Sequence, residues 1–246
     1  MFEPVIIKST SNPIYKDFIK AREEGKRNGV IFLEGEDLVK MAFSQGALKK
    51  TAYLEGSSPL FKEEHPTFFS KGLLRNLSSY GSLPKVIGIA SFSYKEEPDG
   101  DRIVYLDGLQ DPGNLGTIAR TALAFSYPSL VLSSDCVSPY NAKSVAASKG
   151  SFLSLNIVKM SLEDVKKRGY ALIMTSLTGE DIHNVKSMPK KYCLVIGNEG
   201  QGIPKEDQKK ADLNLYLPID RSIDSLNAGV AAGIFMYLLK EKTFTD

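Results

Sequence analysis

Three short segments in the C-terminal half of the chain combine glycine or serine with polar side chains that could do chemistry. Residues 114–120 read Asn-Leu-Gly-Thr-Ile-Ala-Arg, residues 197–202 read Gly-Asn-Glu-Gly-Gln-Gly, and residues 225–227 read Ser-Leu-Asn. Glycine allows the backbone to approach a ligand closely, while carboxylate, amide and guanidinium groups supply hydrogen bonds and charge. We therefore treat the three segments as candidates for one ligand site.

The first and third segments are also suited to begin helices. Asn114 is a plausible N-cap for a helix over residues 115–124, and Ser225 is a natural N-cap for a final helix with Asn227 in its first turn. Arg120 lies one turn beyond Gly116 and projects from the same helix. An ordinary capped helix with a surface arginine explains the first segment equally well.

The second segment follows an apolar strand predicted at residues 193–196. Its three glycines leave backbone amides able to face a ligand, with Glu199 held among them. The glycine spacing is not that of a dinucleotide-binding loop, and no lysine follows as in a phosphate-binding P-loop. A tight turn between a strand and a helix is the alternative interpretation.

The final helix is rich in small residues, including Gly229 and Gly233. A glycine inside a soluble helix costs about 1 kcal/mol relative to alanine, and close packing against another backbone is the usual compensation. A subunit interface would provide such packing, and so would a neighbouring helix of the same chain.

The elements that must position these segments alternate between strands and helices from residue 102 onward. The predicted strands are 103–106, 130–133, 153–158, 171–175, 193–196 and 213–217. The predicted helices are 115–124, 142–147, 162–167, 205–210 and 226–240. This alternation predicts an α/β fold, a largely parallel sheet with helices on both faces. Residues 1–95 form a separate unit, and the charged, turn-rich stretch 94–101 is the best linker candidate.

Composition restricts the function classes. The net charge is only +2, so RNA would have to be attracted by local patches, for which the first choice is the N-terminal group Lys16, Lys20, Arg22, Lys26 and Arg27. Two cysteines in apolar runs, no signal peptide and no apolar stretch of roughly 20 residues predict a soluble cytoplasmic protein without a membrane segment. Neither histidine has metal-ligand spacing to a cysteine, so no metal is expected.

The three segments, in this order and each at a strand end, resemble the motifs of the SpoU/TrmH family within the SPOUT RNA methyltransferases. The resemblance covers about residues 102–241, and more weakly Asn12-Pro13, 32–35 and 83–90 resemble that family's N-terminal domain. It implies an RNA substrate-binding domain at residues 1–95 and a catalytic domain at 102–246 with a C-terminal trefoil knot. It further implies a homodimer that uses S-adenosylmethionine to methylate a ribose 2′-hydroxyl of rRNA or tRNA.

The resemblance also assigns site residues. The matching functional polar positions are Asn114, Arg120, Glu199, Ser225 and Asn227. The cofactor-binding positions are Ser176, Leu177, Gly197, Gly202, Leu217 and Leu226. Because a guanidinium stays protonated in proteins, we expect Arg120 to grip the RNA phosphate and the 2′-oxygen, with Glu199 or the phosphate influencing the proton.

Two positions depart from the family pattern. Arg221 stands where the family usually has glycine, and Ala146 replaces a common arginine. These departures bear on the RNA substrate more than on the cofactor. A catalytically silent RNA-binding or assembly protein that retains the knotted dimeric fold is the alternative, although all five polar positions are retained.

Overall fold

The chain folds into two compact units. The computed structural model describes residues 6–79, 81, 83–220, 222–240 and 242–245. The first unit comprises Met1–Ser93 with Pro139–Leu153, and the second comprises Tyr94–Ser138 with Ser154–Asp246. The sequence division placed all of residues 102–246 in one domain, whereas residues 139–153 group with the first unit.

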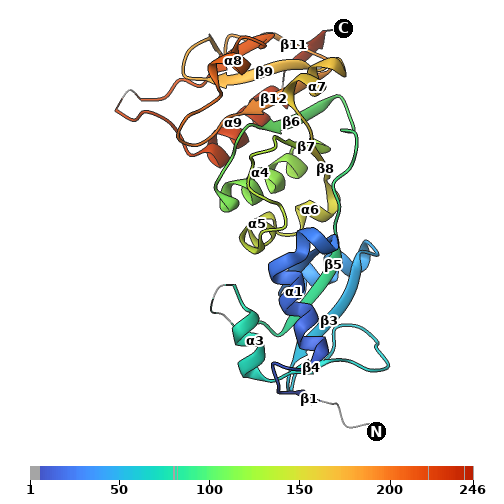
Figure 1. Cartoon of the computed structure of the whole chain (residues 1–246). Helices are drawn as coiled ribbons and strands as arrows, with labels where there is room; N and C mark the ends of the chain where they lie inside the picture. The colour runs from blue at the N-terminus through green and yellow to red at the C-terminus, as the bar shows by residue number, and fades with distance from the viewer. Residues whose placement is uncertain (1–5, 80, 82, 221, 241, 246) are drawn as a thin grey trace. The chain divides into compact units, whose positions relative to one another are not determined.

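The first unit is built on a five-stranded mixed sheet, coloured blue to green in Figure 1. Its strands lie in the order β1 (Ile6–Ile7), β4 (Phe68–Phe69), β3 (Leu48–Leu54), β5 (Val86–Ser91) and β2 (Val30–Glu34). Its helices are α1 (Pro13–Asn28), α2 (Glu36–Ser44), α3 (Lys71–Leu77) and α5 (Ala142–Ser148), and α6 (Ser151–Ser154) begins in it.

Helix α1 has clear start and packing signals in the sequence. Asn12 caps it by accepting a hydrogen bond from the Ile14 backbone N–H at 2.9 Å, and Pro13 occupies the first helical position. The buried face includes Tyr15 and Phe18, whose rings pack edge-on against Phe69 with centroids 5.4 and 5.3 Å away. This cluster forms the core of the first unit.

The second unit is built on a seven-stranded sheet in which every pair of neighbours is parallel. The order is β10 (Glu180–Asp181), β13 (Leu213–Tyr216), β9 (Ala171–Ser176), β12 (Tyr192–Ile196), β6 (Arg102–Leu106), β7 (Ser129–Leu132) and β8 (Asn156–Lys159). A separate parallel pair joins β11 (Ser187–Pro189) to β14 (Thr243–Thr245). The expected α/β class is confirmed, and the parallel register brings the carboxyl ends of the strands to one edge.

Four helices of this unit are α4 (Pro112–Ala124), α7 (Leu162–Lys167), α8 (Lys205–Gln208) and α9 (Ala228–Lys240). The strand expected at 153–158 was partly wrong, because its first residues belong to α6 and the strand begins at Asn156. The apolar run could not distinguish a short buried helix from a strand.

Helices α4 and α9 pack against each other. A methyl group added to Gly229 would lie 3.3 Å from Thr117 Cγ2, and one added to Gly233 would lie 3.5 Å from Thr121 Cγ2. Packing inside one chain therefore explains Gly229, where a side chain would be crowded, whereas a methyl group on Gly233 would make only an ordinary contact. On the same two helices Leu123, Val230 and Tyr237 remain 40%, 52% and 53% exposed.

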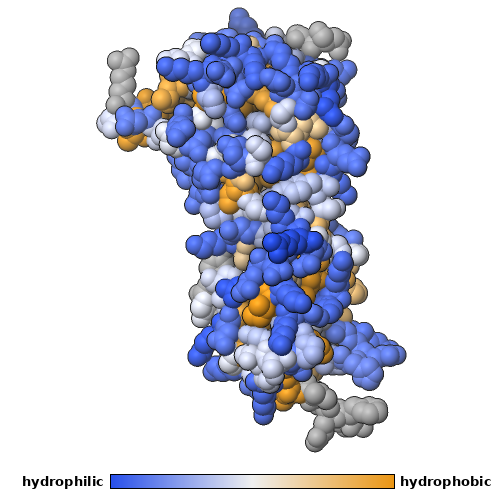
Figure 2. Space-filling model, viewed as in Figure 1, coloured by the Kyte–Doolittle hydropathy of each residue, from blue (hydrophilic) through white to orange (hydrophobic). Residues whose placement is uncertain are grey.

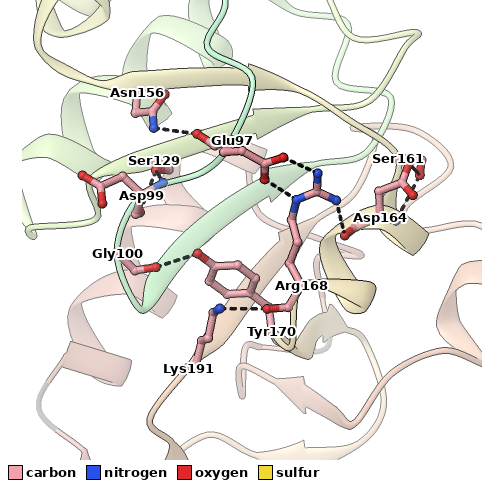
Figure 3. Close-up of polar contacts among 10 residues, drawn as sticks. All are labelled: Glu97, Asp99, Gly100, Ser129, Asn156, Ser161, Asp164, Arg168, Tyr170 and Lys191. Atoms are coloured by element: carbon pink, nitrogen blue, oxygen red, sulfur yellow. Dashed lines mark hydrogen bonds and ion pairs between the residues drawn. The ribbon is translucent and has the colours of Figure 1, made fainter.

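Residues 94–101, expected to be a linker, are fastened to the second unit (Figure 3). The Glu97 carboxylate forms a two-pronged contact with the Arg168 guanidinium, and the Glu97 carbonyl accepts a hydrogen bond from Asn156 Nδ2 at 2.9 Å. The Tyr170 hydroxyl donates to the Gly100 carbonyl at 2.6 Å. We call this segment the strap.

The surface in view in Figure 2 is predominantly hydrophilic with scattered apolar patches, one of them beside the loop between β13 and α9. Within the described residues, no helix has the length and apolar character required to cross a membrane.

Candidate active site

A cavity of about 480 Å³ lies in the second unit, among the loops that follow its central strands. The loops after β9, β12 and β13 contribute to its wall, together with the start of α9. In a parallel sheet such loops converge at the carboxyl edge, where α/β domains place their ligands. The cavity size is within the range of ordinary small-molecule sites.

All six residues expected to bind a cofactor line this cavity. They are Ser176, Leu177, Gly197, Gly202, Leu217 and Leu226. Apolar side chains that the sequence analysis did not select, including Ile196, Ile203 and Phe235, complete the wall. Leu177 is 70% exposed, so an apolar side chain of the cavity wall remains open to solvent.

The loop from Gly197 to Gly202 is closed by backbone hydrogen bonds. The N–H of Asn198 donates to the carbonyl of Gly202 at 3.1 Å, and the reverse bond is 2.9 Å long. A Cβ on Gly197 would lie 2.4 Å from the carbonyl carbon of Gly202, and Gly202 has φ of +67°. The spacing of these two glycines is thus required by the loop itself, before any ligand is considered.

Asn198 holds this loop against the end of β6. Its Oδ1 accepts from the N–H groups of Gly200 at 2.9 Å and Gln201 at 3.0 Å, and its Nδ2 donates to the Gly108 carbonyl at 2.7 Å. The sequence analysis did not select Asn198, although an asparagine that precedes glycines by two residues often hydrogen-bonds to its own loop.

Glu199, Asn114 and Asn227 form a continuous chain of side chains. Asn114 Nδ2 donates to Glu199 Oε1 at 3.0 Å, and Asn227 Nδ2 donates to Asn114 Oδ1 at 2.9 Å. The three candidate segments, which are far apart in the sequence, therefore meet at one place. Glu199 belongs to the cavity wall, and so does Ser225, which lies two residues before Asn227 in the sequence.

The environment of Glu199 stabilises its ionised form. Partial burial raises the pKa of Glu199, but the Asn114 amide and the backbone N–H groups of Gln110 and Asp111 outweigh this effect and hold the pKa below its usual value. The bonds from Gln110 and Asp111 are 3.1 and 3.0 Å long. Glu199 is consequently a fixed anion near neutral pH.

Two helix caps differ from those expected. Asp111, not Asn114, caps α4, because its Oδ1 accepts from the Asn114 N–H at 2.7 Å and Pro112 begins the helix. Asn227, not Ser225, caps α9 by accepting from the N–H groups of Gly229 and Val230 at 2.9 and 3.2 Å. Asn114 and Asn227 thus use their amides to join segments together.

Arg120 is not part of the cavity wall. It lies exposed on α4, and the described part of the chain offers its guanidinium no hydrogen-bond or ion-pair partner. The other arginine of interest, Arg221, lies outside the described residues. Ala146 is half-buried on α5 in the first unit.

Asp107 is a buried carboxyl group at the end of β6 that the sequence analysis did not select. It is 9% exposed, and no described group bonds its Oδ2. Burial raises the pKa of Asp107 to about 6, and the negative charges of Asp207 and Asp135 act in the same direction.

The fold and site define an α/β domain with a ligand cavity at the carboxyl edge of a parallel sheet. The profile described as the SpoU rRNA methylase family matches residues 101–237. The chain belongs to this family and is an RNA methyltransferase, as its sequence motifs predicted.

Similar proteins agree with this assignment. The chain is 25% identical over 244 residues to the 23S rRNA (guanosine(2553)-2'-O)-methyltransferase RlmP of Bacillus subtilis, with 95% of this chain and 98% of that protein covered. It is 27% identical over 257 residues to an uncharacterized tRNA/rRNA methyltransferase of Synechocystis sp., covering 94% and 92% of the two chains. A crystal structure of an AdoMet-bound rRNA methyltransferase from Sinorhizobium meliloti matches with a TM-score of 0.84 and 26% identity over 96% of this chain and 97% of that one.

Proposed function

We propose that the cavity binds S-adenosylmethionine and that the chain transfers its methyl group to a ribose 2′-hydroxyl of rRNA or tRNA. The observation that carries this proposal is the chain of hydrogen bonds from Glu199 through Asn114 to Asn227 at the edge of the cavity. The similar RlmP of Bacillus subtilis is named as a 2′-O-methyltransferase, and the similar structure from Sinorhizobium meliloti is named as AdoMet-bound.

The lining of the cavity fits such a cofactor. Leu217, Leu226 and Ile196 offer apolar surface for a flat ring, while the backbone around Gly197 and Gly202 offers hydrogen-bonding groups at close range. Ser176 Oγ accepts a hydrogen bond from the Thr178 N–H at 3.1 Å and lies 3.5 Å from Thr178 Oγ1, so two hydroxyl groups stand together at this end of the cavity. When bound, S-adenosylmethionine supplies a methyl group on a positively charged sulfur.

The side chains around the cavity would orient the reacting oxygen. Glu199 already accepts bonds from three groups, and its pKa is lowered. It is therefore a poor proton acceptor, and we assign it the role of holding Asn114 and the loop after β6 in place. The 2′-hydroxyl proton would then leave to an RNA phosphate oxygen or to water.

Arg120 would bind the RNA. Its exposed guanidinium, which has no partner within the described residues, can form two parallel hydrogen bonds to a phosphate and stabilise negative charge developing on the 2′-oxygen. This role is restricted to arginine, because lysine binds a phosphate as a point charge without the paired geometry.

The deciding experiment measures cofactor binding and methyl transfer separately. We expect calorimetry to detect S-adenosylmethionine binding, and total RNA from a strain lacking the gene to acquire 2′-O-methyl groups, mapped by resistance to alkaline cleavage.

Arg120→Lys should keep cofactor binding and lower turnover by about 100-fold, in line with the loss of one transition-state donor. Undiminished turnover in Arg120→Lys would remove the paired-contact role. Absence of cofactor binding would reject methyl transfer and favour a silent RNA-binding protein.

We also propose a homodimer formed through α4 and α9. Leu123, Val230 and Tyr237 are large apolar side chains left 40–53% exposed on two adjacent helices, and such a patch is typical of an interface. The C-terminal trefoil knot and the cytoplasmic location remain proposals that rest on the family.

In the same way, we propose that the first unit binds the RNA substrate, with exposed Lys16, Lys20 and Lys26 of α1 contributing.

A further inference from the structure

The first unit contains a groove of about 470 Å³ that the methyl-transfer site does not use. Its walls come from α1, the end of α2, the start of β3 and the loop between β3 and β4. The chain segments that build it can be followed in Figure 1 from α1 to β4. The lining residues combine apolar rings with lysines.

Two phenylalanines of this groove stack on each other at the surface. The ring centroids of Phe43 and Phe61 are 4.1 Å apart and the ring planes are tilted by 17°. Phe43 is nevertheless 55% exposed, and Ile14 beside it in the groove wall is 40% exposed. Phe61 packs its loop onto α2, but this packing leaves more than half of the Phe43 side chain open to solvent.

The charges around these rings favour an anion. Lys49, Lys50 and Lys62 all line the groove. Lys50 is paired with Asp17, whereas Lys49 and Lys62 have no ion-pair or hydrogen-bond partner within the described residues.

The acidic residue of the groove is already engaged. Glu63 accepts hydrogen bonds from Thr51 Oγ1 at 3.1 Å and from the Tyr53 hydroxyl at 2.5 Å. Burial and the bond to Glu63 raise the pKa of Tyr53 to about 12, so this donor is retained at neutral pH. The groove therefore contains one hydrogen-bonded carboxylate, that of Glu63, together with the unpaired ammonium groups of Lys49 and Lys62, so its charge is net positive.

We propose that this groove holds an unpaired nucleotide of the RNA substrate, with the base stacked on Phe43 and its phosphates beside Lys49 and Lys62. An exposed aromatic ring next to unpaired lysines is the combination by which proteins bind single-stranded nucleic acid. A duplex does not fit this arrangement, because its bases are already stacked on each other. The inference rests on the proposed RNA methyl transfer and names the part of the substrate that the first unit binds.

The chain contains no tryptophan, so a single substitution can place a fluorescent reporter in the groove. We expect Phe43→Trp fluorescence to be quenched by a single-stranded RNA oligonucleotide and not by a duplex of equal length. Ile6→Trp is the matched control, since Ile6 is 38% exposed on β1 of the same unit, outside the groove, and should not respond. Equal quenching of both variants, or of Phe43→Trp by the duplex, would overturn the proposal.

Affinity measurements separate stacking from packing. Phe43→Tyr keeps the ring and should bind single-stranded RNA like the parent chain, whereas Phe43→Leu keeps apolar contact with Phe61 and should bind about tenfold more weakly. Lys62→Gln should flatten the slope of log affinity against log salt by about 0.7, the value for one phosphate contact to a single strand. Lys71→Gln, a lysine outside the groove, is the control.

The outcomes distinguish this proposal from the proposed function. All groove variants should bind S-adenosylmethionine unchanged, because the cofactor cavity belongs to the other unit. If the parent chain binds RNA and Phe43→Leu binds it equally well, the groove proposal alone fails, and the apolar rings would fit a protein partner better. If the parent chain binds no RNA, both proposals fail.

Discussion

Asn114 is the central residue of the polar chain, because it donates to Glu199 and accepts from Asn227. Asn114→Asp would keep the bond from Asn227, lose the bond to Glu199 and place a second carboxylate about 3 Å from the first. We expect a loss of about 2 kcal/mol in the free energy of unfolding near neutral pH and weaker S-adenosylmethionine binding.

The loss of unfolding free energy caused by Asn114→Asp should be smaller in mildly acidic buffer, because protonation of one of the two carboxyl groups removes the repulsion between them. Urea unfolding at about pH 8 and about pH 5 measures both effects. Asn184→Asp, at an exposed turn asparagine, is the control and should change stability little at either pH. An Asn114→Asp protein with parent-like stability at about pH 8 would contradict the bridging role.

Removing the charge of Asp107 should stabilise the fold at high pH, which is the opposite of the effect expected for Asn114→Asp. The pKa of Asp107 rises from 3.8 in the unfolded chain to about 6 in the fold, so its ionisation opposes folding. This destabilisation is absent below about pH 4 and fully present above about pH 6. Asp107→Asn should therefore raise the free energy of unfolding at about pH 8 by roughly 3 kcal/mol, with little change at about pH 4. A gain that does not depend on pH would show that charge is not the cause.

At the scale of elements, the strap of residues 94–101 depends on contacts with partners far along the chain. Tyr170→Phe removes only the hydroxyl that donates to the Gly100 carbonyl, and we expect a loss of about 1 kcal/mol. Hydrogen exchange within residues 94–101 should accelerate while the central strands stay protected. Tyr216→Phe is the control, because the Tyr216 hydroxyl has no recorded partner in the described ranges.

The strap also shows which features the sequence could predict. Local alternation was sufficient for most strands and helices of the parallel sheet, although not for β10 or the start of β8. Of the three motifs, the second and third contribute to the cavity wall, whereas the first reaches it only through the bond from Asn114 to Glu199. The two-pronged contact between Glu97 and Arg168 joins residues 71 positions apart, so local composition indicated only a charged linker. The grouping of residues 139–153 with the first unit depends on tertiary packing in the same way.

The helix caps were misassigned for a more local reason. Asp111 and Asn114 can both cap α4, and Ser225 and Asn227 compete for α9. The position of Pro112, which favours the first turn of a helix, already indicated Asp111. The chain from Glu199 to Asn227 could not be inferred from single segments, because it depends on the side-chain geometry of three loops.

At the scale of the whole molecule, the exposed apolar side chains of α4 and α9 predict self-association. Val230→Glu should convert a dimer into a monomer, because a charge at the centre of an apolar interface would be buried without a partner. Light scattering after size-exclusion chromatography measures the mass. Phe43→Glu, an equally exposed apolar site in the first unit, should leave the mass unchanged. A parent chain that is monomeric at micromolar concentration would refute the interface.

The path of the chain between its two units limits how a unit of one such enzyme can be exchanged for that of a homologue. It passes from one unit to the other three times, after Ser93, Ser138 and Leu153, and α5 packs on β2 of the first unit. A gene fragment beginning at residue 94 would keep α5 without β2 and uncover Val145, which is 2% exposed in the fold. Exchange of the first unit between homologous genes therefore needs crossovers on both sides of residues 139–153, and a single fusion point would yield an aggregation-prone hybrid.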